Sequence, residues 1–245
     1  MNSIRLTIIL FLALYPQFLL ANDGNQILRK VDERLFPESF ESYRKIINEE
    51  PNGNVKEFVF FTVKKGRDKV AMLYLEPASD RGRATLRLGD NMWLHIPNVG
   101  RPIRITSMQS VVGGVFSNAD IMQLDYSVEY TAEIQEQTDE VWILSAKALT
   151  KTVAYDRLKM WVQKDSYNLL KIEAYAATGM LIKTINFKEI KDFGGGIIRP
   201  AVMETTSPLY KGYRSVMIYA GMKKRSLADE VFTLAYLDRL VELRK

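Results

Sequence analysis

The chain has 245 residues, of which 47% are hydrophobic, 26% charged and 11% aromatic, the composition of a foldable globular protein. It has no cysteine and one histidine, which excludes disulfides, cysteine nucleophiles, thiolate zinc sites and any site that needs two histidines. The formal net charge of +5 is mild, and because basic and acidic residues are interleaved along the chain, we expect no nucleic-acid partner.

The first 21 residues are typical of a secretory signal peptide. Met1–Arg5 is a short positive start, Leu6–Leu20 is almost unbroken apolar sequence, and Ala21 ends the run. We expect cleavage near Ala21, which leaves residues 22–245 as a single domain that is soluble outside the cytoplasm. An uncleaved membrane anchor is the alternative, although the apolar run is short for a span and Pro16 interrupts it.

The mature chain is predicted to begin with one amphipathic helix and to continue mainly as strands. Apolar residues at 25–36 recur at spacings of three and four, and Pro37 ends the pattern. From Phe40 onward the period is two for most of the chain, in segments of roughly eight to twelve residues divided by turn signals. The segments 57–63 and 70–75 are apolar on both faces, so they need cover on each side of a sheet.

One stretch, 107–125, breaks the strand pattern. It has no period-two alternation, and a connection of this length in a compact domain is usually a lid or contains helix. Ser117 or Asn118 can cap a short helix there. We interpret the stretch as two apolar helical pieces joined at a hinge formed by Gly113 and Gly114, and expect it to be the moving part of the molecule.

The supply of methionine and aromatic residues permits two interpretations. Methionines fall on strand-like segments, and methionine suits a cavity that accepts flexible acyl chains. The alternative is that these side chains simply fill a core. The methionines in question are Met72, Met92, Met160 and Met203.

Motifs of catalysis, cofactor binding and metal binding are absent from the sequence. There is no phosphate-binding loop, dinucleotide fingerprint, nucleophile elbow or HExxH motif, so we expect no cofactor, no metal and no catalytic residue. His95 lacks a recognisable triad partner and is interpreted as a surface or half-buried structural residue. Gly194-Gly195-Gly196 lies between two strand-like runs and is interpreted as a hairpin turn.

Several segments together resemble the LolA-like outer-membrane lipoprotein-sorting family. The clearest motif is Gly89-Asp90-x-x-Trp93-x-x-x-Pro97 followed by Arg101-Pro102-x-Arg104-Ile105, and the likeness continues through 116–121, 125–130 and 232–237. It therefore spans nearly the whole mature chain. The chain departs from the family pattern at 114–117, where many relatives carry Ser-Asp-Phe-Ser, and so lacks a lid carboxylate at that point.

The resemblance implies a fold that is mainly β with a few helices. This fold is a half-open antiparallel β-barrel of about eleven strands, with helices as a lid over a hydrophobic cavity. It also implies a periplasmic carrier of acylated lipoprotein or another lipid, with an inner-membrane transporter as donor and an outer-membrane acceptor. Two alternatives remain open: a sensor or adaptor on the same fold that regulates a membrane partner, and an enzyme acting on lipids or cell-wall polymer.

The candidate site residues follow from this implied fold. Trp93 and Ile96 lie on opposite faces of an ideal strand, so both face inward only if a bulge or bend intervenes. Arg101 and Arg104 are expected to hydrogen-bond the lid or a cargo head group, or else to be exposed charges at a strand end. The residues expected to form the cavity and lid are Met92, Trp93, Ile96, Ile103, Ile105, Val111, Phe116, Ile121, Met122 and Leu124, with Gly113 and Gly114 as the hinge.

Overall fold

The computed structural model describes residues 23–110 and 112–244, so the predicted signal peptide, Val111 and Lys245 lie outside the described residues. In these described ranges, thirteen antiparallel strands form one open sheet in the order β6-β5-β4-β3-β2-β1-β13-β12-β11-β10-β9-β8-β7. The predicted half-open barrel is therefore confirmed, with more strands than the expected eleven. The expected number comes from the family resemblance and not from a count of strand-like segments in the sequence.

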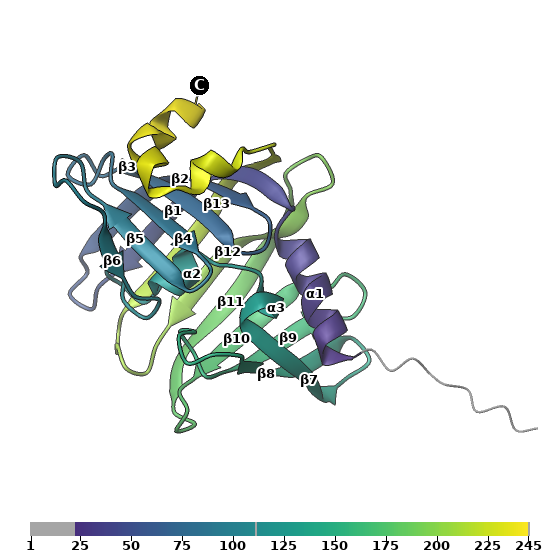
Figure 1. The fold of residues 1–245 in the computed structure, drawn as a ribbon. Coiled ribbons are helices and arrows are strands. Elements are labelled where there is room, and N and C mark those ends of the chain that lie inside the picture. Colours follow the sequence, from purple (N-terminus) through teal and green to yellow (C-terminus); the bar gives the residue numbers. More distant parts are fainter. Residues whose placement is uncertain (1–22, 111, 245) are drawn as a thin grey trace, which may run out of the picture.

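The strands of the sheet curve around a set of short helices (Figure 1). The strands are β1 (Ser39–Glu49), β2 (Val55–Lys65), β3 (Lys69–Glu76), β4 (Ala84–Leu88), β5 (Asn91–His95), β6 (Ile103–Ile105), β7 (Tyr130–Gln137), β8 (Val141–Ala148), β9 (Arg157–Gln163), β10 (Leu169–Tyr175), β11 (Leu181–Asp192), β12 (Ile198–Thr206) and β13 (Arg214–Lys224). The helices are α1 (Gly24–Leu35), α2 (Asn118–Ile121), α3 (Tyr126–Glu129) and the 3₁₀ helices η1 (Asp229–Phe232) and η2 (Leu234–Arg244).

Helix α1 lies on the inner side of the sheet, as its amphipathic pattern predicts. Asp23 caps its first turn by accepting a hydrogen bond from the Asn25 amide, and its apolar stripe is fully buried. The helix also reaches the free edge of β7, where the Asn25 side chain accepts from the Ala132 amide at 2.8 Å. A Cβ at Gly24 would stand 2.4 Å from the Ala132 carbonyl oxygen, so only glycine permits this approach.

The sheet is covered on both faces, as the doubly apolar strands require. On β2 and β3 the residues Phe60 and Met72 point into the inner core, whereas Phe61 and Leu73 belong to a second core on the outer side. The 3₁₀ helices η1 and η2 supply the outer cover, and Figure 1 shows this yellow C-terminal segment on the opposite side of the sheet from α1. The prediction of cover on each side is confirmed.

The lid segment, described at residues 107–110 and 112–125, runs across the open side of the curved sheet. It differs from the expected pair of helical pieces, because in its described part only α2 is helical, and Gly113 and Gly114 lie in an irregular loop before it. Ser117 caps α2 through a capping box with Asp120, which confirms the predicted cap.

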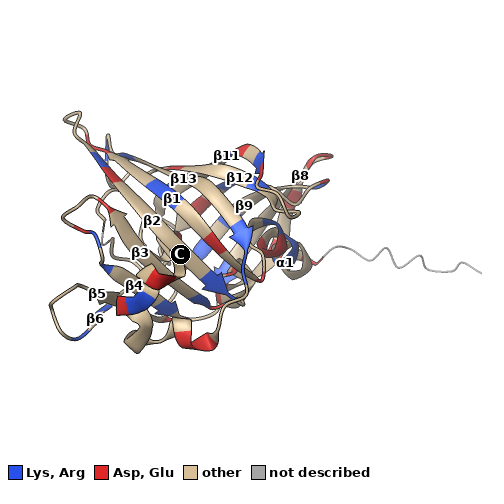
Figure 2. Cartoon of the chain, turned by 90° about the horizontal axis from the view of Figure 1, so that it is seen from above, with Lys and Arg blue, Asp and Glu red and all other residues tan. Residues whose placement is uncertain are grey.

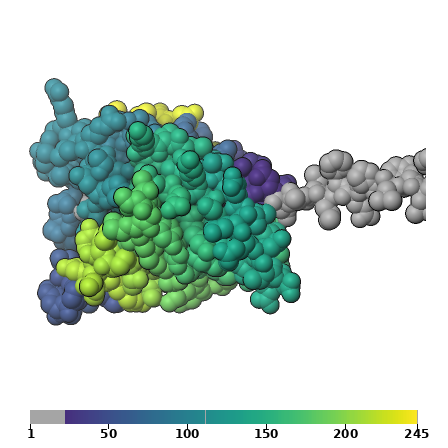
Figure 3. Space-filling model, turned by 90° about the horizontal axis from the view of Figure 1, so that it is seen from below, coloured from purple at the N-terminus to yellow at the C-terminus, as the bar shows by residue number. Residues whose placement is uncertain are grey.

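The length of the helices, the distribution of charge and the exposed strands complete the description of the fold. In the described part of the chain no helix is long and apolar enough to cross a bilayer. Seen from above, basic and acidic residues are interspersed over the sheet rather than separated by sign (Figure 2). Seen from below, the green strands between β7 and β12 form most of the surface (Figure 3).

Candidate functional site

The concave side of the sheet is a large apolar interior that the lid segment fills. Val112, Phe116, Ile121, Met122 and Leu124 are all buried in the inner core, against residues from strands on both sides of the opening. The space left beneath the lid is small: about 20 Å³ between α2, α3 and β9–β12, and about 10 Å³ beside Arg44 and Lys64. Each volume is close to what one water needs, so any larger guest requires the lid side chains to move.

Three cations on the inner side of the sheet hold the backbone of the lid. Arg44 Nη1 on β1 donates to the Ile121 carbonyl at 2.7 Å, and Arg87 Nη1 on β4 donates to the Met122 carbonyl at 3.1 Å. Lys183 Nζ on β11 donates to the Val115 carbonyl. Hydrogen bonds from charged donors are stronger than neutral ones, so these three contacts latch the segment to the sheet without strand pairing.

Lys183 also faces a carboxylate of the lid. Its Nζ lies 2.8 Å from Asp120 Oδ2, and the Tyr155 hydroxyl lies 3.0 and 2.9 Å from the two Asp120 oxygens. Burial, followed by the nearby Asp120 charge, raises the pKa of Tyr155 well above its usual range, so the phenol keeps its proton and donates. The departure at 114–117 therefore does not leave the lid without a carboxylate, because Asp120 is buried in it.

The glycine pair is attached to the sheet at the β1–β13 pair. Asn48 Nδ2 donates to the carbonyls of Val112 and Gly113 at 3.1 and 3.3 Å. The Ser215 hydroxyl donates to Asn48 Oδ1 at 2.7 Å and accepts from the Val115 amide at 2.9 Å. Gly114 packs so closely that a Cβ would stand 2.2 Å from Asn48 Oδ1.

The other end of the interior holds a stack of cations and aromatic rings. Arg199 is fully buried between the rings of Tyr219 and Phe36, with its guanidinium carbon 4.0 and 4.9 Å from their centroids. Lys64 also contacts the Phe36 ring, with its Nζ 4.1 Å from the ring centroid. The same Nζ forms an ion pair with Asp125 at the end of the lid. Among the described residues Arg199 makes no contact with a carboxylate; its Nη1 donates to the Leu35 carbonyl at 2.5 Å.

The structure brings together six of the ten residues that the sequence predicts for the cavity and lid. Met92 and the lid residues Phe116, Ile121, Met122 and Leu124 lie in the inner core, and Ile105 packs partly against it. Val111 lies outside the described residues.

Other predicted residues lie elsewhere, which corrects the expectation. Met92 points inward, so its neighbour Trp93 points outward and packs against the second core. Ile103, on the edge strand β6, is 47% exposed, and Ile96 is only half-buried. Arg101 is exposed, and Arg104 is an exposed residue that donates to Asn91 rather than to the lid.

Sequence reasoning missed the residues that do hold the lid. Arg44 follows Phe40 and Ser42 in the inward register of β1, and Lys183 precedes Ile185 in the inward register of β11. A charged residue at an inward position of an alternating strand is the signal that could have found them, because such a side chain needs a buried partner.

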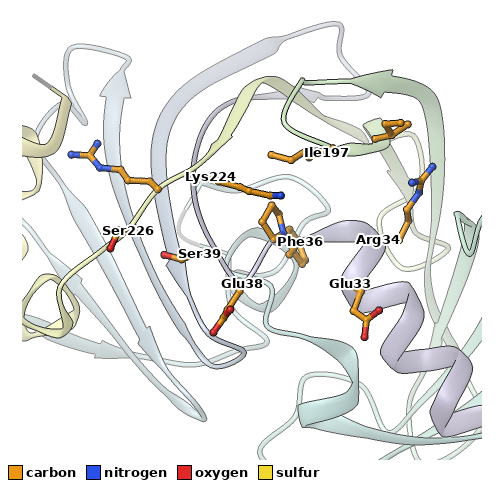
Figure 4. A pocket seen from close by; sticks show the side chains of 12 residues that line it. Glu33, Arg34, Phe36, Glu38, Ser39, Ile197, Lys224 and Ser226 are labelled. Atoms are coloured by element: carbon orange, nitrogen blue, oxygen red, sulfur yellow. The ribbon is translucent and has the colours of Figure 1, made fainter.

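Two solvent-open hollows lie outside this interior. One, of about 690 Å³, lies where α1 ends, and Figure 4 shows Phe36, Ile197 and Lys224 near its centre. The other, of about 550 Å³, lies on the outer side beside His95 and η2. His95 is buried, with Nε2 2.7 Å from Asp238 Oδ1, and so ties η2 to the sheet. In the described residues no group of three or more potential ligand side chains could hold a metal.

The fold and its interior define a class of protein: a half-open β-barrel whose apolar concave side is closed by a lid. A LolA superfamily protein from Nitrosomonas europaea has this fold, with a TM-score of 0.81 and 30% identity over 87% of this chain and 99% of that one. The chain belongs to the LolA superfamily.

Two further solved structures share the fold at lower identity. A putative outer membrane lipoprotein-sorting protein domain from Vibrio parahaemolyticus has a TM-score of 0.77 and 20% identity, over 88% of this chain and 98% of that one. A DUF1329 family protein from Desulfovibrio piger has a TM-score of 0.76 and 24% identity, over 87% and 97%. The family model that matches residues 66–239 is described as "uncharacterized protein". A comparison with curated proteins finds no match.

Proposed function

We propose that the chain is a periplasmic carrier that shields the acyl chains of a lipoprotein or another lipid in the interior beneath the lid segment. The observation that carries this proposal is the way the interior is closed. An apolar concave surface is filled by lid side chains such as Phe116 and Leu124, and the lid is attached by separate polar contacts rather than by strand pairing. Such a cover can be exchanged for a guest without unfolding the sheet.

The energetics of acyl transfer suit this arrangement. Moving an acyl chain of about 16 carbons out of water is worth on the order of 12 kcal/mol, at about 0.8 kcal/mol per methylene. An interior that offered all of this energy would not release its cargo. The lid side chains compete for the same surface, so part of the burial energy is offset by lid displacement and release stays accessible.

The direction of transfer and the partners belong to the same proposal. The signal peptide expected at residues 1–21 supports a carrier in the periplasm, where an inner-membrane transporter would supply the cargo and an outer-membrane acceptor would receive it. The relative from Vibrio parahaemolyticus is named as a putative lipoprotein-sorting domain, which supports acylated cargo. The role we propose is binding and release, without catalysis.

Binding of a fluorescent acyl probe to residues 22–245 tests the proposal. We expect saturable uptake, and native mass spectrometry of protein purified from its own periplasm should find a co-purified lipid. Ile185, in the inner core on β11, provides the test site, and Ile190, 51% exposed on the same strand, provides the matched control. Ile185→Gln should weaken uptake strongly and Ile190→Gln should not, with thermal melting used to confirm that both fold. A folded wild-type chain that takes up neither a fatty acid nor its methyl ester, and carries no lipid, would overturn the proposal.

A further inference from the structure

The lid segment presents an anion to a donor pair that belongs to the sheet side of the interior. Lys183 Nζ and the Tyr155 hydroxyl both contact the Asp120 carboxylate, and Lys183 Nζ lies 5.3 Å from the Tyr155 ring centroid. All three side chains are at least nine-tenths buried. The two donors therefore form a compact site for one carboxylate or phosphate group. In this structure the site is occupied by the Asp120 carboxylate of the lid.

The Asp120 carboxylate moves with the lid, because its remaining contacts are internal to that segment. The Ser117 amide and hydroxyl both donate to Asp120 Oδ2, at 2.8 and 3.0 Å, in the cap of α2. The other hydrogen-bond acceptor of Lys183 is the Val115 carbonyl, also in the lid. Displacing the segment therefore removes the carboxylate and the carbonyl from Lys183 together.

The charge balance of the interior changes in the same direction. Five buried cations lie on the inner side of the sheet, and the carboxylates that pair with Lys64 and Lys183 are both in the lid segment. In the described part of the chain Arg44 and Arg199 have no ion-pair partner. An opened interior is thus left with a surplus of positive charge in an apolar setting, which is costly unless an anion enters. The five cations are Arg44, Lys64, Arg87, Lys183 and Arg199.

We propose that the cargo carries an anionic group, a phosphate or a carboxylate, whose oxygens replace those of Asp120 at Lys183 and Tyr155. This inference rests on the proposed carrier function and names the chemical class of its cargo. The closed space beside the donor pair is lined by apolar residues of β9–β12, including Leu158, Ile185 and Met203. An acyl chain attached to the anionic group would lie along this surface, so head group and chain are recognised by adjacent parts of one site. Asp120 is then an internal competitor that keeps the empty carrier closed.

Two variants with opposite expected effects test the proposal. The probes are a fluorescent fatty acid and its methyl ester, which share a chain and differ in charge. The competitors are phosphatidylglycerol and diacylglycerol with matched chains, of which only phosphatidylglycerol carries a phosphate. We expect the wild-type chain to prefer the acid over the ester, and phosphatidylglycerol over diacylglycerol, by at least tenfold. Lys183→Met should bring both ratios close to one. Asp120→Asn should raise the affinity for the anionic probe at least tenfold, because the competing charge is gone.

Lys188→Met is the matched control. Lys188 lies on the same strand as Lys183 but is exposed and paired with Glu204 at 3.1 Å, so its replacement should leave both ratios at the wild-type value. Tyr155→Phe removes the second donor and should reduce the ratios in a smaller step, which keeps the test usable if Lys183→Met does not fold. A preference for only one of the two anionic probes identifies carboxylate or phosphate as the source.

The outcomes separate this inference from the carrier function. If the wild-type chain binds acid and ester equally well and also shows no preference for phosphatidylglycerol over diacylglycerol, the cargo is not selected by an anionic group and the inference is wrong, although the carrier function stands. If Asp120→Asn lowers the affinity for the anionic probe, Asp120 is part of the binding site rather than a competitor, and the inference is also wrong. If no probe binds, the carrier function itself fails.

Discussion

Replacing Gly114 by alanine should open the lid, and Gly113 provides a control in the adjacent position. Both glycines have positive φ, +72° and +70°, so an alanine at either carries a similar backbone strain of about 1 kcal/mol or more. The surroundings differ. A Cβ at Gly113 meets nothing within 4 Å, whereas a Cβ at Gly114 would stand 2.2 Å from Asn48 Oδ1 and 2.6 Å from Ser215 Oγ.

The collision falls on the atoms that hold this part of the lid. Moving Asn48 and Ser215 aside breaks their hydrogen bonds to the Val112 and Gly113 carbonyls and to the Val115 amide. At about 1 kcal/mol each, the three bonds add about 3 kcal/mol to the strain. Gly114→Ala should therefore shift the lid equilibrium toward the open state on the order of 100-fold more than Gly113→Ala.

Amide hydrogen exchange at Val115 measures this shift directly, because its N–H donates to Ser215 in the closed state. We expect much faster exchange at Val115 in Gly114→Ala than in Gly113→Ala, with faster acyl-probe uptake and little change in exchange of the central strands. Equal exchange rates in the two variants would show that the close approach of Gly114 contributes nothing to closure, and the reasoning would be refuted.

Three further outcomes are expected. Burial, and then the charge of Asp125, raises the pKa of Asp32 from 3.8 to about 6. Between these two pH values the folded state keeps a proton that the unfolded state has lost. The free energy of unfolding should therefore fall by on the order of 3 kcal/mol as the pH rises from about 4 to about 6. Denaturant titrations across this range should show the slope, and Asp32→Asn should flatten it; an unchanged slope in the variant assigns it to another group. Leu237→Ala leaves a cavity in the outer core, where Leu237 is 1% exposed, and should lower the free energy of unfolding by about 2–4 kcal/mol in a denaturant titration. Acyl uptake should stay unaltered. Reduced uptake in a folded sample would show that the two faces of the sheet are coupled. Ile103→Asp should leave acyl-probe affinity at the wild-type value, because Ile103 is half exposed on the edge strand; a large loss would return it to the binding interior.

The elements that the sequence predicted are those with local signals. The apolar stripe of α1, the doubly apolar strands β2 and β3, and the cap at Ser117 each depend on residues close together in the chain. The cations that hold the lid have no such local signal, because each contacts a residue far away in the sequence. Lys183 contacts Asp120 across 63 positions, and Arg44 contacts Ile121 across 77. Such pairs depend on the register of strands that are distant in sequence, which no local pattern specifies.

The error over Trp93, and the choice left open for Arg104, have the same origin. The two residues face each other across β5 and β6, and their motif is clear in the sequence. The direction in which they point depends on which face of β5 is inward. Met92, the neighbour of Trp93, occupies the inner core, so Trp93 and the Arg104 that faces it point outward. A motif can therefore identify a fold correctly although some of its residues point away from the concave interior.

Helix α1 also protects one edge of the sheet from pairing with a second copy of the chain. An open sheet ends in strands with unpaired backbone groups, which readily pair with another chain. At β7 this edge is occupied by α1, through the contact of Asn25 with Ala132, 107 positions later in the sequence. The cover can form only after β7 has been synthesised and folded. A chain that lost α1 would present β7 as an open template, so deletion of residues 23–35 should convert a self-limiting fold into one that assembles edge to edge.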